Sequence, residues 1–137
     1  MRIATEDLKE GFELPTLSKA VTLDKMKVFS ASTGKSFHTD EETAKKFGFP
    51  KAVAQGLITY VYLVEVLVRF FGEDWLRGGK IETAFLKAVF DGDIISTKVV
   101  VRSKQREGSA ERVNLDVSCE NQKGETVTAG TATLLIH

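Results

Sequence analysis

His38 has the clearest capacity for acid-base chemistry in this chain. The only other histidine, His137, is the terminal residue. An imidazole titrates near neutral pH, so it can take a proton from water and return it, as hydration, dehydration and hydrolysis require. Ser36 could orient a water beside it, and Asp40 is the nearest carboxylate. Each has a structural alternative: His38 can be a solvated loop residue, and Asp40 can stabilise a first helical turn.

Ala54, Gln55 and Gly56 form a second candidate site at the start of a long apolar stretch. The first N–H groups of a helix have no intrahelical partners and carry the positive end of its dipole. Gly56 would let a substrate approach them closely, with Ala54 and Gln55 beside it. One such donor to a thioester carbonyl is typically worth about 10²- to 10³-fold in rate. Alternatively, these residues simply make a tight turn into the helix.

The stretch from Gln55 to Phe71 predicts the central helix. It is too long and too continuously apolar for a typical strand, so the rest of the chain must wrap it. Glu65 and Arg69 stand at i, i+4 spacing and predict an ion pair on this helix. Gly72 predicts its end.

Shorter elements are predicted before this helix. Residues 1–20 predict an extended beginning, residues 21–23 a short strand, and Asp24 the start of a helix to about Thr33. Thr39-Asp40-Glu41-Glu42 has the form of a capping box, which predicts a short helix from Thr39 to Phe47. His38 would then directly precede a helix.

After Gly72 the pattern changes to strands. Four strands are predicted at residues 80–90, 94–105, 110–120 and 126–136, joined by short turns as an antiparallel meander. The third alternates clearly, with Val113, Leu115, Val117 and Cys119 on one face. This phase places Cys119 in the core, as a small buried thiol rather than a nucleophile.

Together these elements predict an α+β protein, with one antiparallel sheet curled around one long helix. Residues 1–137 are expected to form a single domain. Val127, Ala129 and Leu135 on one face of the last strand, and three apolar residues on the other, suggest that a second subunit covers it. Exposed sheet edges also favour side-by-side pairing, so we expect a homodimer or a higher homo-oligomer.

Composition narrows the possible partners and cofactors. Nineteen basic and nineteen acidic residues cancel, so no net field favours nucleic acid or an anionic membrane. A single cysteine and an acidic N-terminal segment favour a cytoplasmic location. One Cys and two His offer no metal constellation, and no cofactor motif is found. Arg102, Lys104 and Arg106 alternate at one strand end, where they could bind phosphates or form a solvated face.

Several motifs together resemble the MaoC-like, or (R)-specific enoyl-CoA hydratase, family of hotdog proteins. They are His38-Thr39-Asp40, Ala44, Gly48-Phe49-Pro50, Ala54-Gln55-Gly56, Phe90-Asp91-Gly92-Asp93, and the segments 121–125 and 128–130. The resemblance covers about residues 20–135. It implies a hotdog fold, dimers with sheets joined edge to edge, and an acyl-thioester site between subunits.

The resemblance also implies roles for individual residues. In the family, a histidine and an aspartate five positions before it hold the water that adds to the enoyl double bond, and a glycine N–H holds the thioester carbonyl. His38 and Gly56 match these positions. The family motif G-D-x-N-P-x-H is shortened here to residues 34–38, with Thr33 five positions before His38. No carboxylate lies between Asp24 and Asp40.

Three functions therefore stay open from the sequence. The first is hydration or dehydration of a 2-enoyl or 3-hydroxyacyl thioester carried on CoA or an acyl carrier, with no cofactor besides the thioester. The second is a hotdog acyl-CoA thioesterase. The third is a non-catalytic acyl-thioester binding module, which the missing aspartate favours.

Overall fold

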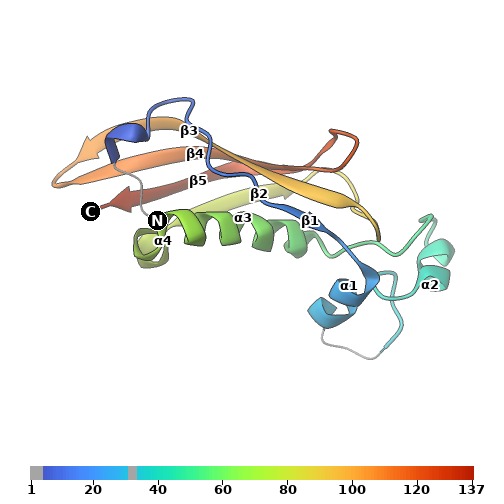
Figure 1. The fold of residues 1–137 in the computed structure, drawn as a ribbon. Helices are drawn as coiled ribbons and strands as arrows, with labels where there is room; N and C mark the ends of the chain where they lie inside the picture. Colours follow the sequence, from blue (N-terminus) through green and yellow to red (C-terminus); the bar gives the residue numbers. More distant parts are fainter. Residues whose placement is uncertain (1–4, 31–33) are drawn as a thin grey trace.

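The computed structural model describes residues 5–30 and 34–137. One antiparallel sheet lies over one long helix, and two short helices extend beyond the start of that helix (Figure 1). This confirms the predicted arrangement of a sheet around a central helix. In chain order the elements are η1 (Thr5–Asp7), β1 (Ser18–Ala20), α1 (Leu23–Ser30), α2 (Glu41–Lys46), α3 (Gly56–Phe71), α4 (Glu73–Gly78), β2 (Lys80–Phe85), β3 (Ile94–Glu107), β4 (Ala110–Glu120) and β5 (Thr126–Ile136).

Helix α3 confirms the predicted central helix, with Gln55 as the residue before its first turn. Leu63 and Leu67 are fully buried against the sheet, as the apolar pattern requires. The helix is not wrapped on every side, since Leu57 is 51% and Val61 42% exposed in the single chain. One apolar stripe of α3 is therefore open to a partner or to solvent.

The strand order is β1-β3-β4-β5-β2, so the predicted four-strand meander is wrong at its first step. Strands β3, β4 and β5 form a meander, but β2 pairs with the far edge of β5. Residues 86–93 leave the ladder and cross back to β3. Local turn signals cannot distinguish a hairpin from this crossover, because pairing partners are chosen by the tertiary fold.

The predicted alternation of β4 is confirmed, with Val113, Leu115, Val117 and Cys119 all buried. Burial raises the pKa of the Cys119 thiol to about 12, so this thiol stays protonated near neutral pH. On β5, however, Val127 is fully buried rather than on the face of Ala129. A register shift after Cys119 leaves Val127 without a partner on β4, which is a β-bulge.

Three predictions before α3 need correction. The early strand lies at Ser18–Ala20, and Leu23 already begins α1. The predicted end of that helix, Thr33, lies outside the described residues. Helix α2 is capped by Asp40, whose carboxylate accepts the Thr43 N–H at 3.0 Å. Thr39 does not cap it, because its hydroxyl donates to the Gly34 carbonyl within the preceding loop.

Candidate functional site

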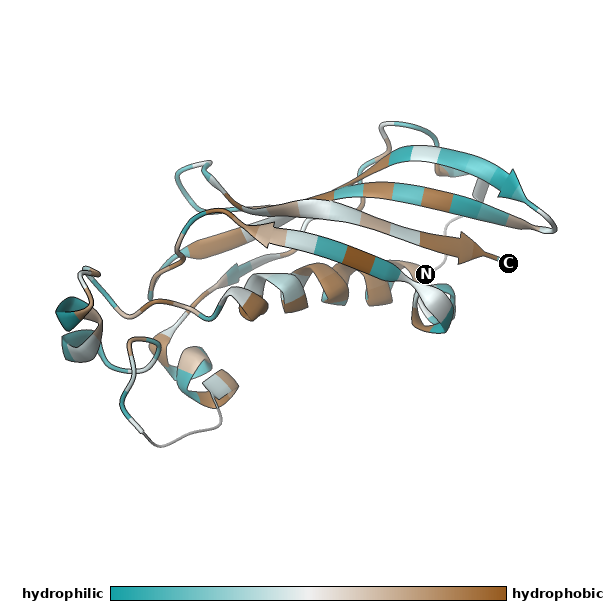
Figure 2. Cartoon of the chain, turned by 180° about the vertical axis from the view of Figure 1, so that it is seen from behind, coloured by the Kyte–Doolittle hydropathy of each residue, from teal (hydrophilic) through white to brown (hydrophobic). Residues whose placement is uncertain are grey.

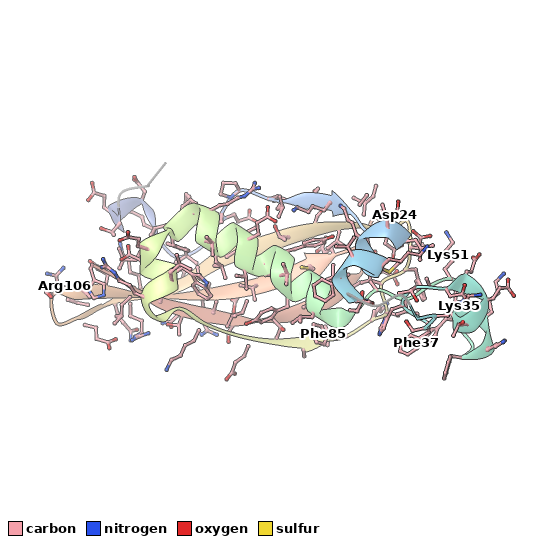
Figure 3. All side chains as sticks on the ribbon, turned by 90° about the horizontal axis from the view of Figure 1, so that it is seen from below. Asp24, Lys35, Phe37, Lys51, Phe85 and Arg106 are labelled. Carbon is pink, nitrogen blue, oxygen red and sulfur yellow. The ribbon has the colours of Figure 1, made fainter. Side chains whose placement is uncertain are left out.

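A pocket of about 360 Å³ lies at the start of α3. Figure 3 shows Phe37 and Phe85 near this end of the helix, with Arg106 at the opposite end of the molecule. The pocket is built from four parts of the chain that are distant in sequence. They contribute Phe37 and His38; Val53, Ala54, Gln55, Gly56 and Thr59; Phe85, Leu86, Lys87, Ala88 and Val89; and Thr128.

His38 is fixed in one orientation by the backbone of Val53. The Val53 carbonyl lies 2.7 Å from His38 Nδ1, and the Val53 N–H donates to the Phe37 carbonyl at 2.8 Å. Because a carbonyl can only accept, Nδ1 carries the hydrogen in this contact. In the neutral imidazole, Nε2 then holds a free lone pair, which is the form a general base needs.

The crossover after β2 supplies the opposite wall of the pocket. Its amides at Leu86 and Lys87 donate to the Val127 carbonyl at 2.8 and 3.3 Å, one residue beyond the Phe85–Thr128 pair at which the β2–β5 ladder ends. Farther along, the Ala54 N–H donates to the Val89 carbonyl at 2.7 Å. These bonds place the segment before α3 between the His38 loop and the crossover.

The first turn of α3 begins at Gly56 without a capping side chain. Gln55 makes no side-chain cap, and the first turn contains no acidic residue. A Cβ atom on Gly56 would lie 2.9 Å from Cδ2 of Phe85, so glycine permits this close packing. The Gln55 side chain turns away to α1, where it donates to the Met26 carbonyl at 3.2 Å and to the Ser30 hydroxyl.

Ser36 and Asp40 stabilise the loop and helix around His38. The Ser36 hydroxyl accepts the His38 N–H at 3.1 Å. The Asp40 carboxylate accepts the hydroxyl and the amide of Thr43, and these bonds lower its pKa. Neither residue lines the pocket, and no carboxylate does among the described residues. Thr33, at the position of the family aspartate, lies outside the described residues.

The basic residues proposed to bind phosphate are not brought to the pocket within one chain. Arg102 faces Asp116 at 3.6 Å, Arg106 faces Glu111 at 3.6 Å, and Lys104 donates to the Thr5 carbonyl. The end of β3 toward Glu107 is strongly hydrophilic (Figure 2). The arrangement fits a solvated strand face, and the substrate-binding role of Arg102 and Lys104 stays a prediction.

Within residues 5–30 and 34–137, no three His, Cys, Asp or Glu side chains gather as metal ligands would. In the same part of the chain, no helix has the length and apolar character needed to span a bilayer.

A family model described as MaoC like domain matches residues 11–123. The chain belongs to the MaoC-like domain family. No curated protein sequence matches it significantly. The match agrees with the resemblance carried by His38, Gly56 and the segments around them, and it covers every element that lines the pocket except β5.

Solved structures confirm the hotdog fold of this MaoC-like chain. The R-hydratase PhaJ1 from Pseudomonas aeruginosa, in its unliganded form, superposes with a TM-score of 0.79 at 19% identity, covering 94% of this chain and 82% of that one. A MaoC-like dehydratase from Rhodospirillum rubrum gives 0.77 at 25% identity, covering 96% and 94%. The HadBC (3R-hydroxyacyl-ACP dehydratase) complex from Mycobacterium tuberculosis gives 0.71 at 20% identity, covering 95% and 98%.

Sequence reasoning missed several residues that form this MaoC-like pocket. Val53 contacts His38 through its backbone carbonyl, so its side-chain type gave no indication of this role. Phe85 and Thr128 reach the pocket only because β2 and β5 pair at the sheet edge. Thr59 did carry a signal, since it is a polar residue one turn beyond Gly56 in an otherwise apolar segment.

Proposed function

We propose that this protein is a hydratase or dehydratase that interconverts 2-enoyl and 3-hydroxyacyl thioesters. In the hydration direction, His38 Nε2 accepts a proton from water while the water oxygen bonds to C3 of the enoyl group. The π electrons move onto the thioester oxygen, which the Gly56 N–H stabilises. The proton is then returned to C2 as the carbonyl re-forms. Dehydration is the reverse.

The observation that carries this proposal is the 2.7 Å contact between His38 Nδ1 and the Val53 carbonyl. It leaves Nε2 as the acceptor in a pocket that also contains the uncapped first turn of α3. A base and an oxyanion donor in one pocket are the two elements that this reaction needs. The matched family model and the (R)-hydratase neighbour support the same reaction class.

The substrate that fits is an acyl thioester of CoA or of an acyl carrier, and no other cofactor is needed for this mechanism. The neighbour from Mycobacterium tuberculosis is described as acting on 3R-hydroxyacyl-ACP. We extend the thioester class, but no chain length, to this protein. The cytoplasmic location expected from composition stays a prediction.

We further propose that the protein works as a homodimer joined along β2. This strand is at the edge of the sheet, with one side unpaired in the single chain. Leu57, Val61, Phe85 and Leu86 are 42–56% exposed, on α3, β2 and the residue after β2. Pairing two β2 edges would satisfy the strand and cover apolar area. Light scattering at micromolar concentration tests this, and a monomer would contradict it.

One assay distinguishes the proposed reaction from the two alternatives, a thioesterase and a non-catalytic binding module. The full chain is mixed with short and medium 2-enoyl-CoA esters, while absorbance follows the conjugated double bond and a thiol reagent follows free CoA. We expect loss of the double bond without release of thiol. Thiol release would instead support a thioesterase. Binding without either change would support a non-catalytic module, which the absence of a carboxylate among the described lining residues favours.

A further inference from the structure

Two buried threonines connect the first turn of α3 to the sheet. Thr59 lies one turn along the helix from Gly56, and Thr128 lies on β5; both line the pocket and both are 1% exposed. Their hydroxyl oxygens are 2.7 Å apart. The Thr59 hydroxyl also lies 2.9 Å from the Gly56 carbonyl, to which it donates.

The number of hydroxyl hydrogens decides which threonine is the donor in this pair. A hydroxyl has one hydrogen, and Thr59 gives its hydrogen to the Gly56 carbonyl. In the contact between the hydroxyls, Thr128 must therefore be the donor and Thr59 the acceptor. The hydrogen bonds run in one direction, from Thr128 through Thr59 to the Gly56 carbonyl, and bonds aligned in this way polarise one another.

This chain of hydrogen bonds ends on the peptide whose N–H belongs to Leu57. A bond accepted by a peptide carbonyl draws charge from the N–H of the same peptide and makes it a better donor. The amides of Gly56 and Leu57 begin α3, and the described residues give neither a hydrogen-bond partner. Both belong to the helix end with the positive partial charge.

We propose that Thr59 and Thr128 are positioning residues for the thioester carbonyl. They hold and polarise the peptide that joins Gly56 to Leu57, so that the Leu57 N–H, at the helix end just beyond the lining residue Gly56, joins the Gly56 N–H as a second donor to the carbonyl oxygen. This inference rests on the proposed function, because it requires a thioester carbonyl at the start of α3. It adds two side chains that act only through the backbone.

A purely structural role makes a different prediction. Threonines in helices often donate to a carbonyl one turn back, and the Cys119 thiol also approaches the Thr59 carbonyl at 3.7 Å. If the pair only packs the helix on the sheet, removal of one hydroxyl lowers stability and leaves the bound carbonyl unchanged. A measurement on the carbonyl itself separates the two roles.

The test uses Thr59→Val and Thr128→Val, which keep the shape and remove the hydroxyl, and Thr59→Ser, which restores it. Turnover is measured with a 2-enoyl-CoA. Isotope-edited infrared spectra are recorded with bound butanoyl-CoA carrying ¹³C at the carbonyl. Thr59→Val should lower kcat about tenfold with KM nearly unchanged, and shift the carbonyl band toward its free position. Thr128→Val should act more weakly in the same direction, and Thr59→Ser should resemble the parent.

Thr97→Val is the matched control. Thr97 is also a buried threonine, 2% exposed, and its hydroxyl accepts the Leu17 N–H at 2.9 Å, away from the pocket. This variant should lose stability while kcat and the carbonyl band stay at the parent values. The double variant Thr59→Val/Thr128→Val removes both hydroxyls together, so its stability should approach that of the parent. The inference requires its kcat to stay low, and recovery of kcat with stability would overturn it.

The infrared measurement tests the positioning role independently of the proposed function. A parent protein that binds butanoyl-CoA but hydrates no enoyl-CoA contradicts the proposed function alone, and the band of Thr59→Val still tests the positioning role. An unchanged band in Thr59→Val overturns the inference even if the parent is an active hydratase. A parent that binds no thioester overturns both.

Discussion

The two ends of α3 differ in the partners that the protein provides for them. At its C-terminal end, the Gly72 N–H donates to the Val68 carbonyl, and Arg69 places a positive charge where the dipole favours one. Glu65 joins Arg69 at 2.8 Å and Lys19 of β1 at 2.7 Å. At the N-terminal end, Gln55 provides no cap and the first turn contains no acidic residue.

Under the proposed function, this difference would separate stability from catalysis along a single helix. The C-terminal, or closed, end makes its contacts within the protein, as the predicted Glu65–Arg69 ion pair illustrates. The N-terminal, or open, end keeps N–H donors and positive potential available to a ligand, in the pocket that also contains the imidazole of His38. Substitutions at the open end should therefore change catalysis more than stability, and substitutions at the closed end should do the reverse.

The largest effect is expected for His38→Ala, which removes the base from the open end. We expect kcat to fall by about 10²- to 10⁴-fold, because no carboxylate among the described lining residues can replace the imidazole. Steady-state hydration of a 2-enoyl-CoA measures this. His137→Ala is the control, since it removes the other histidine and should keep parent activity. Parent-like turnover by His38→Ala would refute the assigned role.

Gly56→Ala should give the next largest effect. Its Cβ would lie 2.9 Å from the Phe85 ring, so the ring must shift and the new methyl group narrows the approach to the first amides. We expect kcat/KM to fall about tenfold or more. Gly78→Ala is a matched control in α4, because a Cβ there meets nothing within 4 Å. Equal activity of the two variants would argue against a carbonyl site at Gly56.

Gly72→Ala tests the closed end. Gly72 has φ 59° and ψ −128°, a conformation outside the left-handed α region that other residues can adopt, so an alanine there costs about 1–3 kcal/mol. Denaturant unfolding should show a loss of about that size, with the same dependence on denaturant concentration as the parent. Turnover per folded molecule should be unchanged. A large loss of kcat here would show that the two ends of α3 are not separable.

Asp40→Asn should have the smallest overall effect of the four substitutions, because asparagine also caps helices well. The two bonds from Thr43 lower the pKa of Asp40 in the folded protein. The ionised carboxylate therefore stabilises the fold above its unfolded pKa, and this contribution is lost as pH falls through the folded pKa. Stability of the asparagine variant should be less sensitive to acid than that of the parent. A large loss of turnover near neutral pH would instead assign Asp40 a role in proton transfer.

The sequence by itself determined the elements whose signals are local. The apolar run of α3, its stop at Gly72, the alternation of β4 and the inward Cys119 follow from side-chain periodicity, which acts within a few residues. His38 and Gly56 were identifiable because their residue types carry the chemistry and match the family motifs. For Asp40, the sequence left open a role in proton transfer or in stabilising a first helical turn. The structure shows Asp40 as the cap of α2, one residue after the Thr39 cap that the capping box predicted.

Only the tertiary structure decided which distant segments share the pocket. Strand β2 joined β5 rather than β3, and the Val127 carbonyl of β5 accepts the two amides that begin the crossover. The β2–β5 pairing brought Phe85 and Thr128 to the start of α3, and the backbone bond from Val53 to Phe37 holds the Val53 carbonyl beside His38. Such contacts depend on backbone groups and strand partners, which every residue type can supply. For that reason no residue pattern in the sequence predicted these contacts.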